Sequence, residues 1–336
     1  MENAAIKEAK KHFSRIGLFL FLGSLIICVV QILAITIARR IPAIAANEGL
    51  YFLSYILPID LIAFPLIFLI FQRIPAQPAG DRKKMSVGQF LTAFLIADAG
   101  TVAFNILGNL LTLGIALVKQ SPVDNVVQNL VTNINPVFLF LPSVICAPIM
   151  EELMYRKIIL DRSSHYGEKL SLLFCGLIFG LTHGNLVQFC YAFFLGIFFG
   201  FIYLKTRNIL YPILLHMMIN FLGGFVPSIF STFSYDYIQS LEDYLNAVSA
   251  SSDAASASIV MLHLLPLLLL CIFALFRMGC FISGIILFIL NRKKFVLTAY
   301  ESDLEKGQQF KTVILNPGML LFSIFWIVMI IWQLIR

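Results

Sequence analysis

The chain has 336 residues, of which 60% are apolar and only 12% are charged. A soluble domain carries about a quarter charged residues, so this composition excludes a soluble globular protein and a disordered chain. The formal net charge is +6, from 24 Lys and Arg against 18 Asp and Glu. Because the basic residues stand in short stretches between apolar runs, we expect them to face a lipid bilayer and not a nucleic acid.

Nine apolar runs approach or exceed the ~20 residues that a helix needs to cross a bilayer. Helices are expected because an isolated strand cannot satisfy its backbone hydrogen bonds in lipid. The predicted spans cover residues 16–38, 51–72, 88–118, 136–160, 170–184, 186–204, 208–230, 257–291 and 317–335. The predicted fold class is therefore all-α, a polytopic transmembrane helical bundle of about 8–9 spans.

Two of these runs have unusual lengths. Residues 170–184 are short for a full crossing, so their outer end is expected to stop inside the membrane. Residues 257–291 are long enough to split in two, but a split would move the basic residues 292–294 to the outer side. We therefore expect one long helix there.

Basic and poorly charged loops alternate along the chain. No Lys or Arg lies between Lys119 and Arg156, or between Arg207 and Arg277. Cytoplasmic loops carry the excess of Lys and Arg, so we expect a multi-pass protein of the cell membrane with a cytoplasmic N-terminus.

The predicted spans fall into three parts. Residues 1–135 hold about three N-terminal transmembrane helices, 136–230 hold a core, and 231–336 hold a C-terminal loop and further helices. No internal repeat is evident in the chain.

Polar residues at membrane depth are costly, and each needs a partner or a function. The third span carries Asp98, Thr101, Asn105 and Asn109, whose spacing puts them on one helix face, turned toward the bundle. Asp60 and Arg277 are isolated charges, for which we expect structural pairing.

The core holds the densest set of polar groups. Two carboxylates, a guanidinium, two imidazoles and an amide belong to its apolar helices: Glu151, Glu152, Arg156, His183, His216 and Asn220. The helical rise puts the carboxylate, imidazole and amide groups within a ~10 Å band near the middle of the bilayer.

The spacing of these residues suggests distinct roles. Glu152 and Arg156 are four residues apart and can pair on one face. Glu151 lies ~100° away around the same helix and is left free to act as a general base. His216 and Asn220, also four residues apart, present two possible donors on one face.

The ordered motifs EExxxR, FxxxH and HxxxN on successive apolar helices resemble the CPBP family. This group contains type 2 CAAX prenyl proteases and bacteriocin-processing (Abi) intramembrane proteases. The stretch GFIYLKTRNILYPILLHMMIN is similar to the last motif region of that family, and the resemblance covers residues 136–224. It implies a helical protease with an intramembrane active-site cavity.

The resemblance implies a role for each motif residue. Glu151 would activate a water molecule with the help of His183. His216 and Asn220 would stabilise the oxyanion, and Glu152 and Arg156 would support Glu151. A peptide or protein presented at the membrane, such as a tail or leader peptide, would be the substrate.

No cofactor is expected, although zinc bound by Glu151, His183 and His216 is an open alternative because two His and one Glu form a known catalytic zinc set. GxSxG and HExxH motifs are absent, which disfavours serine-hydrolase and classical zinc-protease routes. Two other functions stay open: a secondary transporter that uses the buried polar groups, and a non-catalytic bacteriocin-immunity or scaffold membrane protein.

Overall fold

The computed structural model describes residues 4–76, 80–231, 256–297, 304 and 307–336, and these residues form helices without any strand. The first half contains α1 Ala4–Ala38, α2 Pro42–Ala45, α3 Glu48–Pro58, η1 Ile59–Ala63, α4 Phe64–Phe71, α5 Val87–Lys119 and α6 Val126–Asn133. The core contains α7 Pro136–Leu139, η2 Phe140–Cys146, α8 Ala147–Glu152, η3 Leu153–Leu160, α9 Asp161–Ser163, η4 Ser164–Tyr166, α10 Glu168–Leu181, α11 Leu186–Thr206, α12 Leu210–Asn220 and η5 Phe221–Phe225. The remainder contains α14 Ser256–Asn291, η6 Arg292–Lys294, α15 Gln309–Val313 and α16 Pro317–Ile335.

Eight helical segments of the described chain are long and apolar enough to cross a membrane. They are Ala4–Ala38, Glu48–Phe71, Val87–Lys119, Pro136–Tyr166, Leu186–Thr206, Leu210–Ser231, Leu268–Lys294 and Pro317–Ile335. The protein is thus an integral multi-pass membrane protein with an all-α fold. The run predicted at 170–184 corresponds to α10, whose 14 residues rise only ~21 Å and fall short of the ~30 Å hydrocarbon core.

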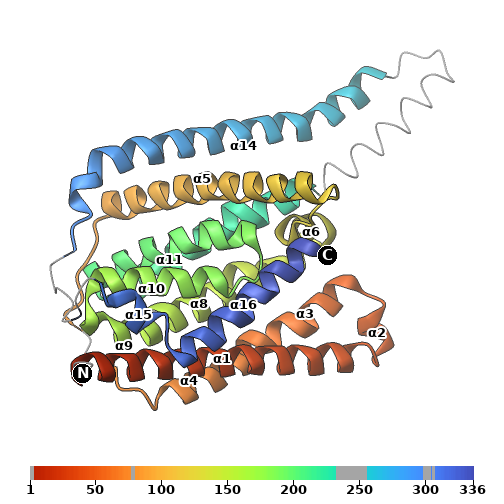
Figure 1. The fold of residues 1–336 in the computed structure, drawn as a ribbon. Coiled ribbons are helices and arrows are strands. Elements are labelled where there is room, and N and C mark those ends of the chain that lie inside the picture. Colours follow the sequence, from red (N-terminus) through yellow and green to blue (C-terminus); the bar gives the residue numbers. More distant parts are fainter. Residues whose placement is uncertain (1–3, 77–79, 232–255, 298–303, 305–306) are drawn as a thin grey trace.

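The long helices lie side by side in a bundle (Figure 1). α14 packs on α5, α5 on α11, α11 on α10, and α1 on α16. The buried core centres on α10, α11 and η3, while apolar side chains of the outer helices, such as Leu290 at 72% exposure, face outward. This is the reverse of a soluble bundle and is what a lipid environment allows.

Two glycines allow α1 and α16 to approach closely. A Cβ atom added to Gly318 would overlap the carbonyl oxygen of Ser14, and one added to Gly17 would overlap the backbone of Met319. Small residues at such crossings let membrane helices pack backbone to backbone.

The segment 256–291 is one helix, as predicted. Its Arg277 forms a structural ion pair, which is also as predicted. Arg277 on α14 donates to the buried carboxylate of Asp98 on α5. Of the other polar residues on the α5 face, Thr101 bonds back to Ala97, whereas Asn109 is exposed and bonds to Asn105 and Asn125. The prediction that Asp98, Thr101, Asn105 and Asn109 all face the bundle is therefore wrong at Asn109.

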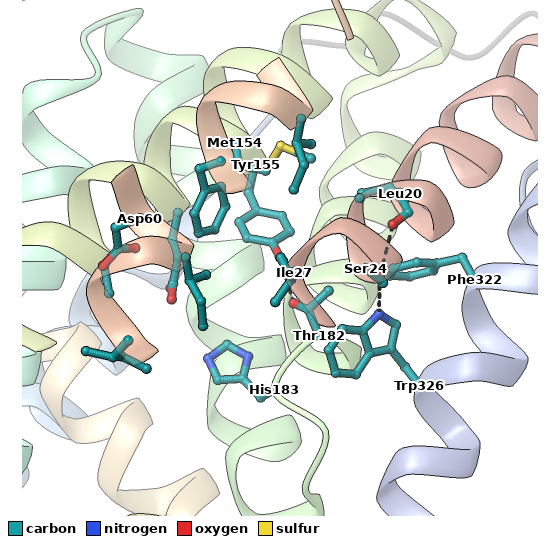
Figure 2. A pocket seen from close by; sticks show the side chains of 17 residues that line it. Leu20, Ser24, Ile27, Asp60, Met154, Tyr155, Thr182, His183, Phe322 and Trp326 are labelled. Atoms are coloured by element: carbon teal, nitrogen blue, oxygen red, sulfur yellow. Dashed lines mark hydrogen bonds between the residues drawn. The ribbon is translucent and has the colours of Figure 1, made fainter. Parts of the chain in front are cut away.

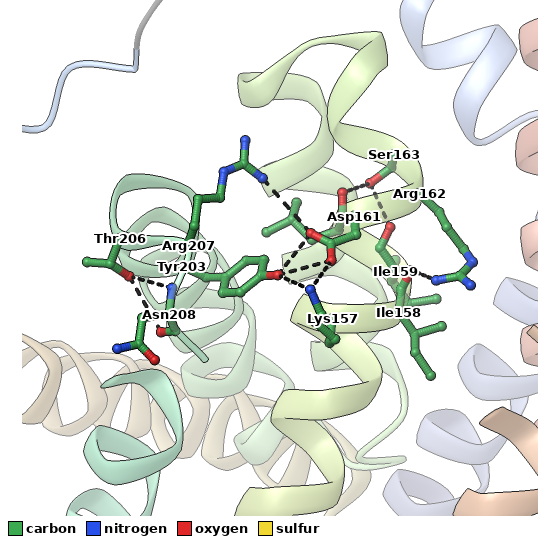
Figure 3. Close-up of polar contacts among 11 residues, drawn as sticks. Lys157, Ile158, Ile159, Asp161, Arg162, Ser163, Tyr203, Thr206, Arg207 and Asn208 are labelled. Carbon is green, nitrogen blue, oxygen red and sulfur yellow. Dashed lines mark hydrogen bonds and ion pairs between the residues drawn. The ribbon is translucent and has the colours of Figure 1, made fainter. Parts of the chain in front are cut away.

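A polar network joins the end of η3 to the end of α11 (Figure 3). The Tyr203 hydroxyl donates to Asp161 at 3.0 Å, and Lys157 Nζ lies 2.9 Å from the same carboxylate. Arg162, which lies just beyond the predicted span 136–160, is buried and donates to the carbonyl oxygens of Ile74 and Ile158. These bonds fix the register of the helices that carry the core motifs.

The division into parts at residues 135 and 230 stays a prediction. The loop that was expected to begin the third part lies largely within 232–255, outside the described residues.

Candidate active site

The helix that carries the two adjacent glutamates is irregular on both sides of them. The π-helical segments η2 and η3 flank α8, which ends at Glu152. Pro142 and Pro148 lie in this stretch, and a proline removes a helical hydrogen bond and crowds the preceding turn. π-helical turns are frequent at functional sites because they redirect the side chains that follow.

Glu152 and Arg156 form the ion pair that their spacing predicts. Oε2 of Glu152 lies 2.9 Å from Nε of Arg156, and both side chains are fully buried. The guanidinium also donates to the Leu195 carbonyl at 3.2 Å and lies 4.9 Å and 5.6 Å from the ring centroids of Phe179 and Phe199. The two aromatic faces and the carboxylate offset the cost of burying this cation.

His216 on α12 contacts both glutamates. Its Nδ1 atom lies 2.9 Å from Glu152 Oε1, and its Nε2 atom lies 3.8 Å from Glu151 Oε2. The second distance exceeds a hydrogen bond. Glu151 itself is 23% exposed by its side chain, in contrast to the fully buried Glu152. The two carboxylates thus have different surroundings, as their positions around the helix predict.

His183 lies just beyond the end of α10. Its Nδ1 atom is 2.7 Å from the carbonyl oxygen of Phe179, whose ring packs edge-on against the imidazole at 5.0 Å. Gly184 follows with a φ of +65°, a left-handed conformation that favours glycine. This turn lets the chain leave α10 while the imidazole stays against the helix end.

Asn220, the last residue of α12, joins its helix to the irregular segment η2. Its side-chain nitrogen donates to the Ser143 carbonyl oxygen at 2.8 Å. Because an amide nitrogen carries two protons, one donor of Asn220 is left for a ligand.

One cavity of about 210 Å³ collects these groups. Its walls include Glu151, His183, His216 and Asn220 from three different helical regions, together with Ser143, Gln188 and Tyr191. Glu152 and Arg156 are not among its lining residues; Glu152 contacts His216, and Arg156 pairs with Glu152. The structure therefore brings all six predicted residues into one region, four of them at the cavity wall.

The hydrogen bonds constrain which imidazole nitrogens carry protons. A carbonyl oxygen only accepts, so Nδ1 of His183 is the donor and its Nε2 is an acceptor in the neutral ring. The Glu152 carboxylate likewise accepts a hydrogen bond from the protonated Nδ1 atom of His216. His216 can then donate from Nε2 only as an imidazolium, a condition that the spacing of the motif did not reveal.

Comparisons with known proteins agree with this region. Residues 133–222, which contain all six residues, match the family model described as "Type II CAAX prenyl endopeptidase Rce1-like". This segment is therefore similar to the CAAX protease (CPBP) family. The chain is also 27% identical over 168 residues to a Bacillus subtilis (strain 168) protein named "Putative membrane peptidase YdiL". The match covers 46% of this chain and 64% of that protein.

No solved structure matches the chain.

A second cavity of about 250 Å³ adjoins the first (Figure 2). It lies between α1, α3, η1, α4, α8, the turn after α10, and α16, and Glu151 and His183 line both cavities. Its walls include Asp60, for which we expected a structural partner. Asp60 has no hydrogen bond or salt bridge within the described residues, so the expected partner is not found among them, whereas Arg277 is paired as expected. In the sequence, the signal that Asp60 lies in a distorted helical segment is Pro58, two residues earlier. Pro58 directly precedes the π-helical segment η1.

Metal ligation was the remaining alternative for this site. Within the described residues, no three His, Cys, Asp or Glu side chains form a group that could hold a metal ion. Glu151, His183 and His216 thus do not fit a zinc site in this geometry.

Proposed function

We propose that the protein is an intramembrane endopeptidase that hydrolyses a peptide bond with a water molecule activated by Glu151. The observation that carries this proposal is the cavity shared by Glu151, His183, His216 and Asn220, inside the segment that matches the CAAX protease family. The name of the Bacillus relative, "Putative membrane peptidase YdiL", points to the same reaction class.

The proposed reaction begins with proton transfer from water to Glu151. Nε2 of His183 is a second acceptor that orients the same water molecule. The water oxygen bonds to the substrate carbonyl carbon, and the carbonyl oxygen becomes an oxyanion. Glu151 then returns its proton to the leaving nitrogen as the carbon–nitrogen bond breaks.

Asn220 and His216 supply the proposed donors to the oxyanion. The free amide proton of Asn220 and the Nε2 proton of an imidazolium at His216 are available at the cavity wall. Such donors act strongly where water is excluded. In this proposal the Glu152 carboxylate stabilises the imidazolium through Nδ1, and Arg156 orients Glu152 by its ion pair.

The proposed substrate is a peptide or protein segment presented at the membrane, such as a tail or a leader peptide. We further propose the cell membrane as the location, with a cytoplasmic N-terminus, on the basis of the loop charges.

The test is a cleavage assay with the purified full chain in lipid nanodiscs, using a proteome-derived peptide library and mass spectrometry. Wild type should produce new termini that the Glu151→Gln variant does not. Identical product profiles for the two proteins would overturn the proposal. Absence of cleavage together with substrate transport or tight peptide binding would favour the transporter or the non-catalytic reading.

Metal dependence is tested with the same assay. Activity should persist after exhaustive chelation, and elemental analysis should find no stoichiometric metal. Stoichiometric zinc whose removal abolishes cleavage, and whose return restores it, would replace the glutamate mechanism by a metal-dependent one.

A further inference from the structure

Asp60 is an unusual carboxylate for a membrane-spanning helix. It is only 4% exposed, and it lies on η1, the irregular segment that interrupts the span Glu48–Phe71. Charged residues at membrane depth normally pair with each other or line a functional cavity. Asp60 has no ion-pair partner within the described residues, in contrast to Asp98, which is held by Arg277.

The side chain of Asp60 points into the second cavity, across from His183 (Figure 2). Glu151 lines the same cavity, so that two carboxyl groups face one space. No Lys or Arg is among the residues that line it. The described part of the chain therefore places two acidic side chains there without a Lys or Arg of its own.

Apart from Ser24, Tyr155, Thr182 and Trp326, the rest of the cavity wall is apolar. Leu20, Ile27, Ile56, Ile67 and Phe322 are among the lining side chains. Such a wall suits the aliphatic stem of a long basic side chain, whose charged end then meets a carboxylate. The volume of about 250 Å³ is below the about 300–1,000 Å³ of a typical small-ligand site, which fits one side chain better than a whole ligand.

The cavity adjoins the candidate catalytic groups directly. Glu151 and His183 line both cavities, while Asn220 lines only the first of these two. A peptide whose scissile carbonyl lies near Asn220 can thus place a neighbouring side chain past Glu151 toward Asp60.

We infer that the second cavity is a specificity subsite for a Lys or Arg side chain of the substrate, close to the scissile bond, and that Asp60 pairs with its charge. This inference rests on the proposed peptidase function. Ion pairing in a largely apolar cavity gains from the low polarity of its surroundings, and a neutral side chain of the same length leaves Asp60 without a partner.

The first test is the cleavage profile of the peptide library with wild type, Asp60→Asn and Asp81→Asn. Asp81 is exposed and outside both cavities, so its variant controls for the loss of one negative charge. Wild type and Asp81→Asn should favour Lys or Arg about 10-fold or more at one position near the scissile bond. Asp60→Asn should lose that preference.

The second test measures binding without cleavage. Trp326 lines the second cavity. The sequence has two tryptophans, so the Trp332→Phe substitution leaves Trp326 as the single tryptophan. Quenching of Trp326 should report tighter binding of N-acetyl-lysine amide than of N-acetyl-norleucine amide by about 10-fold. The difference should disappear in Asp60→Asn.

The outcomes separate the two proposals. Equal affinity of wild type for both amides, or an unchanged basic preference in Asp60→Asn, overturns the subsite. Asp60-dependent binding of the lysine amide without any cleavage by wild type supports the subsite and overturns the peptidase function.

Discussion

The Nδ1 atom of His216 lies 2.9 Å from Oε1 of Glu152, although 64 residues separate the two in the chain. The other carboxylate oxygen of Glu152 contacts Arg156 at 2.9 Å. One fully buried carboxylate thus orients an imidazole on a neighbouring helix and neutralises a guanidinium on its own helix. Its neighbour Glu151 is partly exposed at the cavity, and this difference underlies the predictions for the two glutamates.

Glu151→Gln should reduce kcat/KM by about 10²–10⁴-fold, because general-base catalysis contributes that much. The fold should persist, since Glu151 makes no short ion pair. Cleavage rates and thermal unfolding in detergent measure the two effects. Glu48→Gln, at an exposed position outside the cavities, is the matched control, and full activity in Glu151→Gln would exclude the general-base role.

Glu152→Ala should destabilise the protein by about 3–5 kcal/mol, since it leaves the buried Arg156 without its carboxylate. It should also lower activity, because His216 loses the acceptor that holds its ring. Equilibrium unfolding in mixed micelles gives the stability. Glu152→Gln should recover part of the activity by offering an amide oxygen to Nδ1 of His216, and equal activity of the Ala and Gln variants would argue against this orienting role.

Asn220→Ala should lower kcat by about 10²–10³-fold with a smaller change in KM, as expected for a donor that acts mainly in the transition state. Loss of the bond to Ser143 adds a local effect on the contact of α12 with η2. Ser143→Ala keeps that backbone carbonyl and serves as the control. A rise in KM at unchanged kcat would assign Asn220 to substrate binding instead.

The Asp98–Arg277 pair should dock α14 on α5 (Figure 1). Arg277→Met alone should lower stability by about 3–5 kcal/mol, because it leaves a buried carboxylate unpaired. The double variant Asp98→Leu/Arg277→Met should recover most of that loss, because a well-packed apolar pair replaces a buried ion pair at little cost. A double-mutant cycle by equilibrium unfolding measures the coupling, and additive losses would mean that the pair contributes no coupling.

Much of the architecture followed from patterns along the chain. The length of the apolar runs predicted the helical spans and the short α10, and the four-residue spacing of Glu152 and Arg156 predicted their ion pair. These features are local, since the helical rise and pitch determine them within one segment.

The contacts between helices were decided by the tertiary structure. Hydropathy does not encode how a membrane helix is rotated, because lipid is as apolar as the side chains of the bundle core. The pairing of Asp98 with Arg277, the contact of His216 with Glu152, and the position of Asp60 across a cavity from His183 all depend on that rotation. The sequence by itself determined which polar groups enter the membrane, whereas helix packing alone determined which of them meet.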